Sequence, residues 1–186
     1  LPISLRLANW IRGPIPREGN EKRPIGTFQN VMFSNIRARV APAADTAMYR
    51  TSKFDPGPSQ VGEDRSCISI TGLPGHPIEG ITMSNIHITF PGGGTAEDAA
   101  RRDIPDLRDD YPEYNIFGVL PAYGLYAHHV KGLVLDNVRF DLATPDLRPA
   151  IVCDDLVGLD LANFTADSNP KAECLIRLEH ARDAFI

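Results

Sequence analysis

The sequence has little of what marks several common protein classes. It has only three cysteines, Cys67, Cys153 and Cys174, odd in number and far apart, so they predict neither a disulfide framework nor a zinc site. No apolar run approaches the roughly 20 residues of a membrane-spanning helix. The net charge of -5, with both signs mixed, leaves no basic stripe for phosphates. We therefore expect neither a nucleic-acid nor a membrane partner, and we interpret the cysteines as small buried hydrophobic residues.

The length suits a single domain. A chain of 186 residues with 42% hydrophobic content can bury one sizeable core. Residues 1–7 have the pattern of a strand, with neither an initiator methionine nor the charged and apolar segments of a secretion signal. We therefore expect one domain over residues 1–186 that is the C-terminal part of a longer chain.

A nine-residue pattern occurs four times in the chain. Each copy reads Gly or Asn, apolar, any, apolar, any, Asn, apolar, any, apolar. The copies are residues 30–38, 80–88, 132–140 and 158–166. Recurrence with Asn in the same position predicts a repeat architecture.

The apolar alternation changes parity at the Asn of each copy. Ile81 and Met83 share one face, whereas Ile86 and Ile88 follow the opposite parity, which one straight strand cannot keep on a single side. Asn adopts the left-handed conformation more readily than other non-glycine residues. We therefore predict a corner at Asn85, and at its equivalents, between two short strands.

The spacing of the copies fits the coils of a solenoid. Asn137 and Asn163 are 26 residues apart, about one β-helical coil, and the longer intervals contain the Pro-, Gly- and charge-rich segments 41–65 and 91–122. Further strands are predicted at residues 66–70, 123–127, 150–153 and 174–178. The pattern therefore predicts an all-β, right-handed parallel β-helix with three strands per coil and long loop insertions.

Other architectures stay open as alternatives. A leucine-rich repeat also has an Asn ladder, but it places two residues between its third apolar position and Asn, whereas one residue separates Leu135 from Asn137. Other β-solenoids and β-sandwiches are the remaining alternatives. The best helix candidate is residues 95–102, where Thr95 is a suitable N-cap with Asp98 in the first turn.

Three segments carry a family resemblance. They are GTFQNVMFSNI at 26–36, ITMSNI at 81–86 and, above all, YPEY followed by FGVLPAYGLY between residues 111 and 126. These segments resemble bacterial members of glycoside hydrolase family 28, the polygalacturonase group, and the resemblance covers most of the chain. It implies a secreted or periplasmic enzyme that hydrolyses pectic polysaccharide with inversion, using aspartates as general acid and base and no metal or other cofactor.

The catalytic motifs of that family are largely missing. Its catalytic aspartates lie in Asn-Thr-Asp and Asp-Asp motifs, which a Gly-His-Gly motif accompanies, and the first and third of these motifs do not occur here. Asp154-Asp155 follows a predicted strand without its companion motifs, so we interpret it as a turn. Asp109-Asp110 is interpreted as part of a solvated loop. The catalytic residues are therefore unknown, and we expect this chain to be inactive without preceding coils.

Four residues are candidates for substrate binding. Arg6 stands where the family has the arginine of an Arg-Ile-Lys segment, and could pair with a uronate carboxylate, although a solvent-facing strand residue is the alternative. Ala8 replaces the lysine, which favours a pectic chain other than ordinary polygalacturonate, or a different sugar. Arg108 and Tyr111 lie in the long loop, and Tyr123 follows it; subunit or coil packing is the alternative role for that loop.

Neighbouring histidines raise a metal hypothesis. We expect no metal at His128-His129, because adjacent strand positions point to opposite faces, and we interpret the pair as structural.

Two function classes remain after these arguments. The chain is either a segment of a polysaccharide hydrolase or a non-catalytic carbohydrate-binding or structural β-helix, and aspartate motifs in an upstream portion would distinguish them. The partner that we expect is a pectic poly- or oligosaccharide substrate. An open N-terminal coil also predicts self-association.

Overall fold

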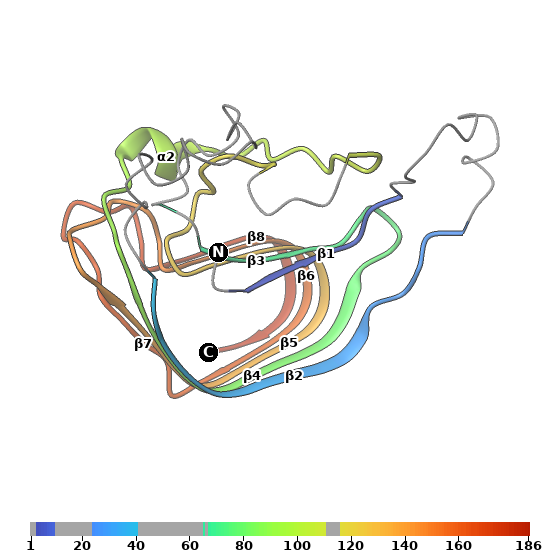
Figure 1. Cartoon of the computed structure of the whole chain (residues 1–186), viewed down its shortest axis with the longest axis horizontal. Coiled ribbons are helices and arrows are strands. Elements are labelled where there is room, and N and C mark those ends of the chain that lie inside the picture. The colour runs from blue at the N-terminus through green and yellow to red at the C-terminus, as the bar shows by residue number, and fades with distance from the viewer. Residues whose placement is uncertain (1–2, 10–23, 41–64, 66, 111–115) are drawn as a thin grey trace, which may run out of the picture.

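The protein is a curved parallel sheet. A computed structural model describes residues 3–9, 24–40, 65, 67–110 and 116–186. One eight-stranded sheet dominates it, all pairings between its named strands are parallel, and the sheet curls into a half-barrel (Figure 1). The all-β, parallel class predicted from the sequence is therefore confirmed.

The strands lie in and between the segments where the repeats occur. They are β1 (Ser4–Arg6), β2 (Gln29–Arg39), β3 (Ile68–Thr71), β4 (Ile78–Phe90), β5 (Leu125–Leu142), β6 (Ile151–Ala162), β7 (Thr165–Ala166) and β8 (Ile176–Phe185). The long strands stack in the order β2-β4-β5-β6-β8, and β1 and β3 extend the layer beside β5. The strands that begin the four copies of the repeat, β2, β4, β5 and β6, therefore pair in the order of the copies, and β8 follows β6.

The predicted helix is present but short. Helix α2 covers Ala96–Ala100, and Thr95 is its N-cap. The Thr95 hydroxyl accepts a hydrogen bond from the backbone N–H of Asp98, and the Asp98 carboxylate accepts one from the backbone N–H of Thr95. This capping box satisfies N–H groups that the first helical turn leaves without partners.

The Asn corners are confirmed. Asn35, Asn85, Asn137 and Asn163 have φ values of 58°, 53°, 53° and 52°. Asn85 Nδ2 donates to Asn35 Oδ1 at 2.6 Å, and Asn137 Nδ2 donates to Asn85 Oδ1 at 3.2 Å. The last corner departs from this ladder, because Asn163 donates to Asp136 instead. Asn therefore both accepts the left-handed backbone and links consecutive turns of the chain.

Two further columns of corners were not predicted. Gly80, Gly132 and Gly158 form one, with φ values of 64°, 73° and 79°. His129, Asp155 and His180 form the other, with φ values of 53°, 51° and 50°. The chain bends at these residues without losing its pairing, so segments 123–127 and 132–140, expected as separate strands, lie within or beside one strand, β5.

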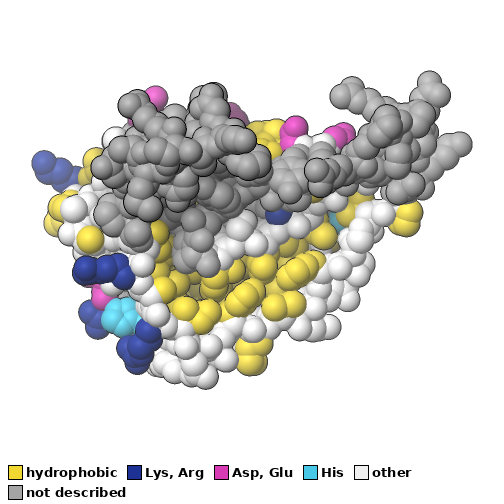
Figure 2. Space-filling model, viewed as in Figure 1, with side chains coloured by type: hydrophobic (Ala, Val, Ile, Leu, Met, Phe, Trp, Pro, Cys, Tyr) yellow, Lys and Arg dark blue, Asp and Glu magenta, His cyan; other side chains and the backbone are white. Residues whose placement is uncertain are grey.

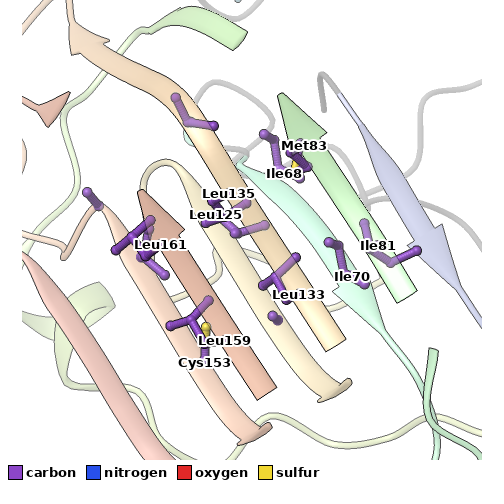
Figure 3. Close-up of a cluster of buried hydrophobic side chains, with 14 of the residues drawn as sticks. Ile68, Ile70, Ile81, Met83, Leu125, Leu133, Leu135, Cys153, Leu159 and Leu161 are labelled. Atoms are coloured by element: carbon purple, nitrogen blue, oxygen red, sulfur yellow. The ribbon is translucent and has the colours of Figure 1, made fainter. Parts of the chain in front are cut away.

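The core fills the concave side of the sheet with stacked apolar columns. Ile81, Leu133 and Leu159 are in register and almost fully buried, as are Met83 and Leu135 (Figure 3). Burying each such side chain contributes about 1.5–3 kcal/mol. The members of a column occupy the same position in each copy of the repeat, so the parallel register places them one above another.

The cysteines follow the sequence-based interpretation in part. Cys67 and Cys153 are fully buried, and Cys174 is partly exposed. All three are free thiols. Burial raises the pKa of Cys67 and of Cys153 to about 12. Two of the three are therefore inert core residues.

The N-terminal edge of the stack is less well covered. Strand β2 pairs with β4, and within the described residues no strand pairs with its other side. Val31, Phe33 and Ile36 pack against the core but are only partly buried. Figure 2 shows hydrophobic side chains in the middle of the face in view. This edge is where the sequence predicts self-association, which stays a prediction.

The long connection from β4 to β5 lies against the outward face of the sheet. Ile104, Phe117 and Leu120 from this connection form a second apolar cluster with Tyr126 and Val152 of the strands. Those two strand residues point away from the main core, because the alternate positions fill it. The loop is therefore packed on the sheet.

Among the described residues, no helix is long and apolar enough to cross a membrane.

Candidate functional site

A column of polar side chains runs along the outward face of the sheet. Arg6, Thr71, His128 and Asp154 are successive partners in the parallel register of β1, β3, β5 and β6. Partners in a parallel ladder point to the same side of the sheet. Residues from four separate strands therefore share one surface beside the long connection.

Arg6 lies beneath the loop. Its guanidinium sits over the Phe117 ring, 5.2 Å from the centroid, and donates to the backbone carbonyl of Leu107. Burial lowers the pKa of Arg6, and the charge of Asp110 opposes that shift. An arginine stays protonated in such surroundings. Arg6 therefore places a positive charge under the loop and joins the loop to the sheet.

Arg108 is brought to the same region and is exposed. It lies in a turn directly after Leu107, whose φ is 48°. The Arg108 carbonyl accepts a hydrogen bond of 2.7 Å from the backbone N–H of Asn9, three residues beyond Arg6. Two of the four predicted binding residues therefore lie on the same side of the sheet, one half-buried and one at the surface.

The other two predicted binding residues do not join them. Tyr111 lies outside the described residues. Tyr123 is 1% exposed, packs edge-on against Phe90 and donates its hydroxyl to the carbonyl of Asp167. Burial raises the pKa of Tyr123 above its ordinary value. Direct contact with a saccharide requires an accessible ring or hydroxyl, so the position of Tyr123 favours a role in the core.

His128 and His129 lie together on this surface, contrary to the geometric argument from the sequence. That argument is wrong because His129 occupies a left-handed corner, with a φ of 53°. Alternation between faces applies to a regular strand, and the corner breaks it. The two rings stack with centroids 3.9 Å apart and planes 20° from parallel.

Carboxylates surround the two rings. His129 Nδ1 lies 2.6 Å from Asp155 Oδ2, and His129 Nε2 lies 3.0 Å from Asp106 Oδ1. His128 Nε2 lies 3.5 Å from Asp154 Oδ2. The His129 side chain is 12% exposed and that of His128 13%. Asp106 belongs to the long connection, so this cluster also joins loop and sheet.

The environment favours neutral His128. Burial lowers the pKa of His128, and the neighbouring His129 acts in the same direction, while nearby carboxylates oppose it.

Thr71, next to His128 in register, is 4% exposed, and its hydroxyl has no hydrogen-bond partner among the described residues. The Tyr126 hydroxyl, also buried, likewise finds no partner within the described part of the chain. Unpaired buried polar atoms are uncommon and often mark functional positions.

The paired aspartates lie within strand β6 and not in a turn after it, which corrects the interpretation from the sequence. Asp155 has a φ of 51° and forms the corner, and Asp154 precedes it on β6. His180 Nδ1 contacts Asp154 Oδ1 at 2.7 Å, so both carboxylates are engaged by histidines. Asp109 and Asp110 are exposed, as expected for a solvated loop.

The sequence missed this cluster for a specific reason. Part of the cluster could have been found from the sequence. Asp155 lies 26 residues after His129, which is the length of one coil, so the two residues occupy equivalent positions in neighbouring coils. His and Asp are enriched at left-handed positions, which was the available signal. Asp106 has no such signal, because it lies in a loop without periodicity.

No family model, curated protein or solved structure matches this chain.

Proposed function

We propose that this chain is the C-terminal part of a pectic polysaccharide hydrolase similar to glycoside hydrolase family 28. In this proposal the strands are coils of a right-handed parallel β-helix with three strands per coil. The catalytic aspartates lie in coils that precede this segment, and the segment supplies scaffold and substrate contacts. The protein acts outside the cytoplasm, secreted or periplasmic, where its polymeric substrate is found.

The corner columns support the β-helix. Three corners recur in the same order, at His129, Gly132 and Asn137 in one copy and at Asp155, Gly158 and Asn163 in the next. The intervening segments pair in parallel with their counterparts. Repeated corners with parallel stacking are what successive coils of a solenoid require.

One observation carries the functional proposal. Arg6, which corresponds to the family's binding arginine, lies over the ring of Phe117, which belongs to the segment of strongest resemblance. The two residues are far apart in the sequence, and each resembles the family independently. Their meeting on the outward face supports a common binding surface there.

The charges of this surface suggest its ligand. Arg108 is exposed beside the strand that carries Arg6, so its guanidinium is available for a uronate carboxylate. Ala8, partly buried, supplies no second cation where the family has lysine. We therefore propose a pectic chain with fewer carboxylates than polygalacturonate, such as a rhamnogalacturonan.

Hydrolysis by the natural full-length protein tests this proposal. Reducing ends should be released from a uronate-containing polymer, with rhamnogalacturonan favoured over homogalacturonan, and none from a neutral arabinan. The 186-residue chain should be inactive on all three. Activity of this chain alone would overturn the placement of the chemistry upstream, and a full-length protein inactive on every uronate polymer would overturn the substrate class.

A non-catalytic carbohydrate-binding module is the second candidate. The observation in its favour is that Asn-Thr-Asp and Gly-His-Gly motifs do not occur in this sequence. The full-length protein distinguishes the two, because a module of this kind would bind insoluble pectin in a pull-down without releasing reducing ends.

A further inference from the structure

Three side chains converge at the His129 corner with the composition of a metal site. Asp106, His128 and His129 each offer one ligand atom, and these atoms lie within 4.8 Å of one another. Donor atoms around a tetrahedral Zn²⁺ with bonds of about 2.0–2.1 Å lie roughly 3.3 Å apart. The separation of 3.0 Å between His129 Nε2 and Asp106 Oδ1 is already close to that value. The His128 ring would have to leave its stack against His129 for the lone pairs of both rings to meet at one ion.

The outer contacts orient His129 as a ligand. Asp155 lies 2.6 Å from Nδ1, which leaves Nε2 facing Asp106. A carboxylate on the far nitrogen fixes the tautomer and makes a coordinating imidazole more basic, and metal-bound histidines commonly have such a partner.

The charges around the two rings also suit a cation. His128 faces His129, and the carboxylates of Asp106, Asp154 and Asp155 lie around the pair. Three carboxylates close to two imidazole rings are a set of oxygen and nitrogen donors that a divalent cation can bind.

Two buried residues, Thr71 and Tyr126, lie next to His128. Thr71 Oγ1 and the Tyr126 hydroxyl have no hydrogen-bond partner among the described residues, and both residues are almost fully buried. Thr71 pairs with His128 in register, and the Tyr126 and His128 ring centroids are 6.0 Å apart.

We propose that Asp106, His128 and His129 bind one divalent transition-metal ion, with Zn²⁺ as the expected species. Two imidazoles and one carboxylate match the nitrogen and oxygen ligands that Zn²⁺ takes, and three protein ligands leave a position for water. The ion would tie the loop that carries Asp106 to the corner of β5. This site is independent of the proposed carbohydrate function.

Titration of the metal-free chain with ZnCl₂ tests the site. The 186-residue chain, treated with EDTA and dialysed, should bind one equivalent of Zn²⁺ in isothermal titration calorimetry. Co²⁺ should give the visible absorption bands of a four-coordinate site. His129→Gln and His128→Gln should each weaken Zn²⁺ binding at least about tenfold, in line with the loss of groups that support a metal site. His87→Gln is the matched control and should leave affinity unchanged, because the partly exposed His87 contacts Asp141 and is not one of the three proposed ligands.

A milder variant keeps the test decisive. His129 also bridges Asp106 and Asp155, so the His129→Gln result counts only when its circular dichroism matches that of the parent. Asp106→Asn keeps the size of a partly exposed loop residue, and it should also lower the affinity about tenfold and remove the Co²⁺ bands. Absence of stoichiometric Zn²⁺ binding, or binding that folded Asp106→Asn and His128→Gln leave unchanged, would overturn the proposal and leave a hydrogen-bonded His-Asp cluster.

Discussion

Asp146 and Arg148 form a buried ion pair, with Arg148 Nη2 2.8 Å from Asp146 Oδ2 and side-chain exposures of 0% and 1%. Arg148 Nη1 also donates to the carbonyls of Leu120 and Ala122 at the end of the long connection. Asp146 accepts a hydrogen bond from the backbone N–H of Gly94 at the start of that connection. One pair therefore anchors both ends of the loop that covers the candidate site.

Removal of Arg148 should be strongly destabilising. Arg148→Met leaves the Asp146 carboxylate buried without its partner, and breaking such a pair costs about 3–5 kcal/mol. Urea unfolding measures the loss. The control is Lys131→Ala, because Lys131 contacts Glu79 at 3.5 Å on the exposed surface and such pairs contribute under about 1 kcal/mol. Equal losses for the two variants would contradict the anchoring role.

The Asn ladder predicts an order of stability. Asn85→Ala places an ordinary residue at a φ of 53° and removes hydrogen bonds to Asn35 and Asn137, for an expected loss of about 1–3 kcal/mol. Asn85→Gly removes the same hydrogen bonds but accepts the backbone conformation, so it should lose less. Urea unfolding of both variants gives the comparison. A glycine variant less stable than the alanine variant would show that backbone strain at this corner is minor.

Thiol reactivity should separate the three cysteines. Cys67 and Cys153 are buried with pKa values raised to about 12, so neither supplies thiolate at neutral pH. Cys174 is partly exposed, although burial and Glu173 raise its pKa. Ellman's reagent should therefore label one thiol slowly in the native chain and three in urea. Rapid native labelling of Cys153, identified by mass spectrometry, would contradict the packed core.

The His128 environment predicts lower stability in acid. Its pKa is lowered on folding, so the unfolded chain takes up a proton there at a pH where the folded chain does not. The free energy of unfolding should therefore fall as the pH drops through the ordinary histidine range near about 6.5. The facing groups are His129, Asp154, Asp106 and Asp155.

Comparison with a variant isolates the His128 contribution. Unfolding at about pH 7.5 and about pH 5.5 should show a smaller loss of stability for His128→Gln than for the parent, in metal-free buffer. The same loss in both proteins would show that the burial of His128 does not control its protonation.

The sequence predicted those parts of the fold that repeat. Asn85 was found as a corner because the apolar parity changes there in every copy. The corner at His129 was missed because its column contains His, Asp and His, three positions with no shared residue type. Asp106 reaches the site from an irregular loop, where periodicity gives no information. Tyr123 could not be assigned to the core, because an aromatic residue after a loop suits either a sugar contact or packing.

The affinity of this chain for an acidic pectic oligosaccharide tests the central claim most directly. In calorimetry, a rhamnogalacturonan oligosaccharide should bind, and the same oligosaccharide with its uronates reduced to neutral sugars should bind much more weakly. Arg108→Ala should weaken binding of the acidic form roughly tenfold or more, as expected for one charge-assisted hydrogen bond, while Lys131→Ala should have no effect. Equal affinity for both forms, or no effect of Arg108→Ala, would contradict an acid-sugar surface beside Arg6.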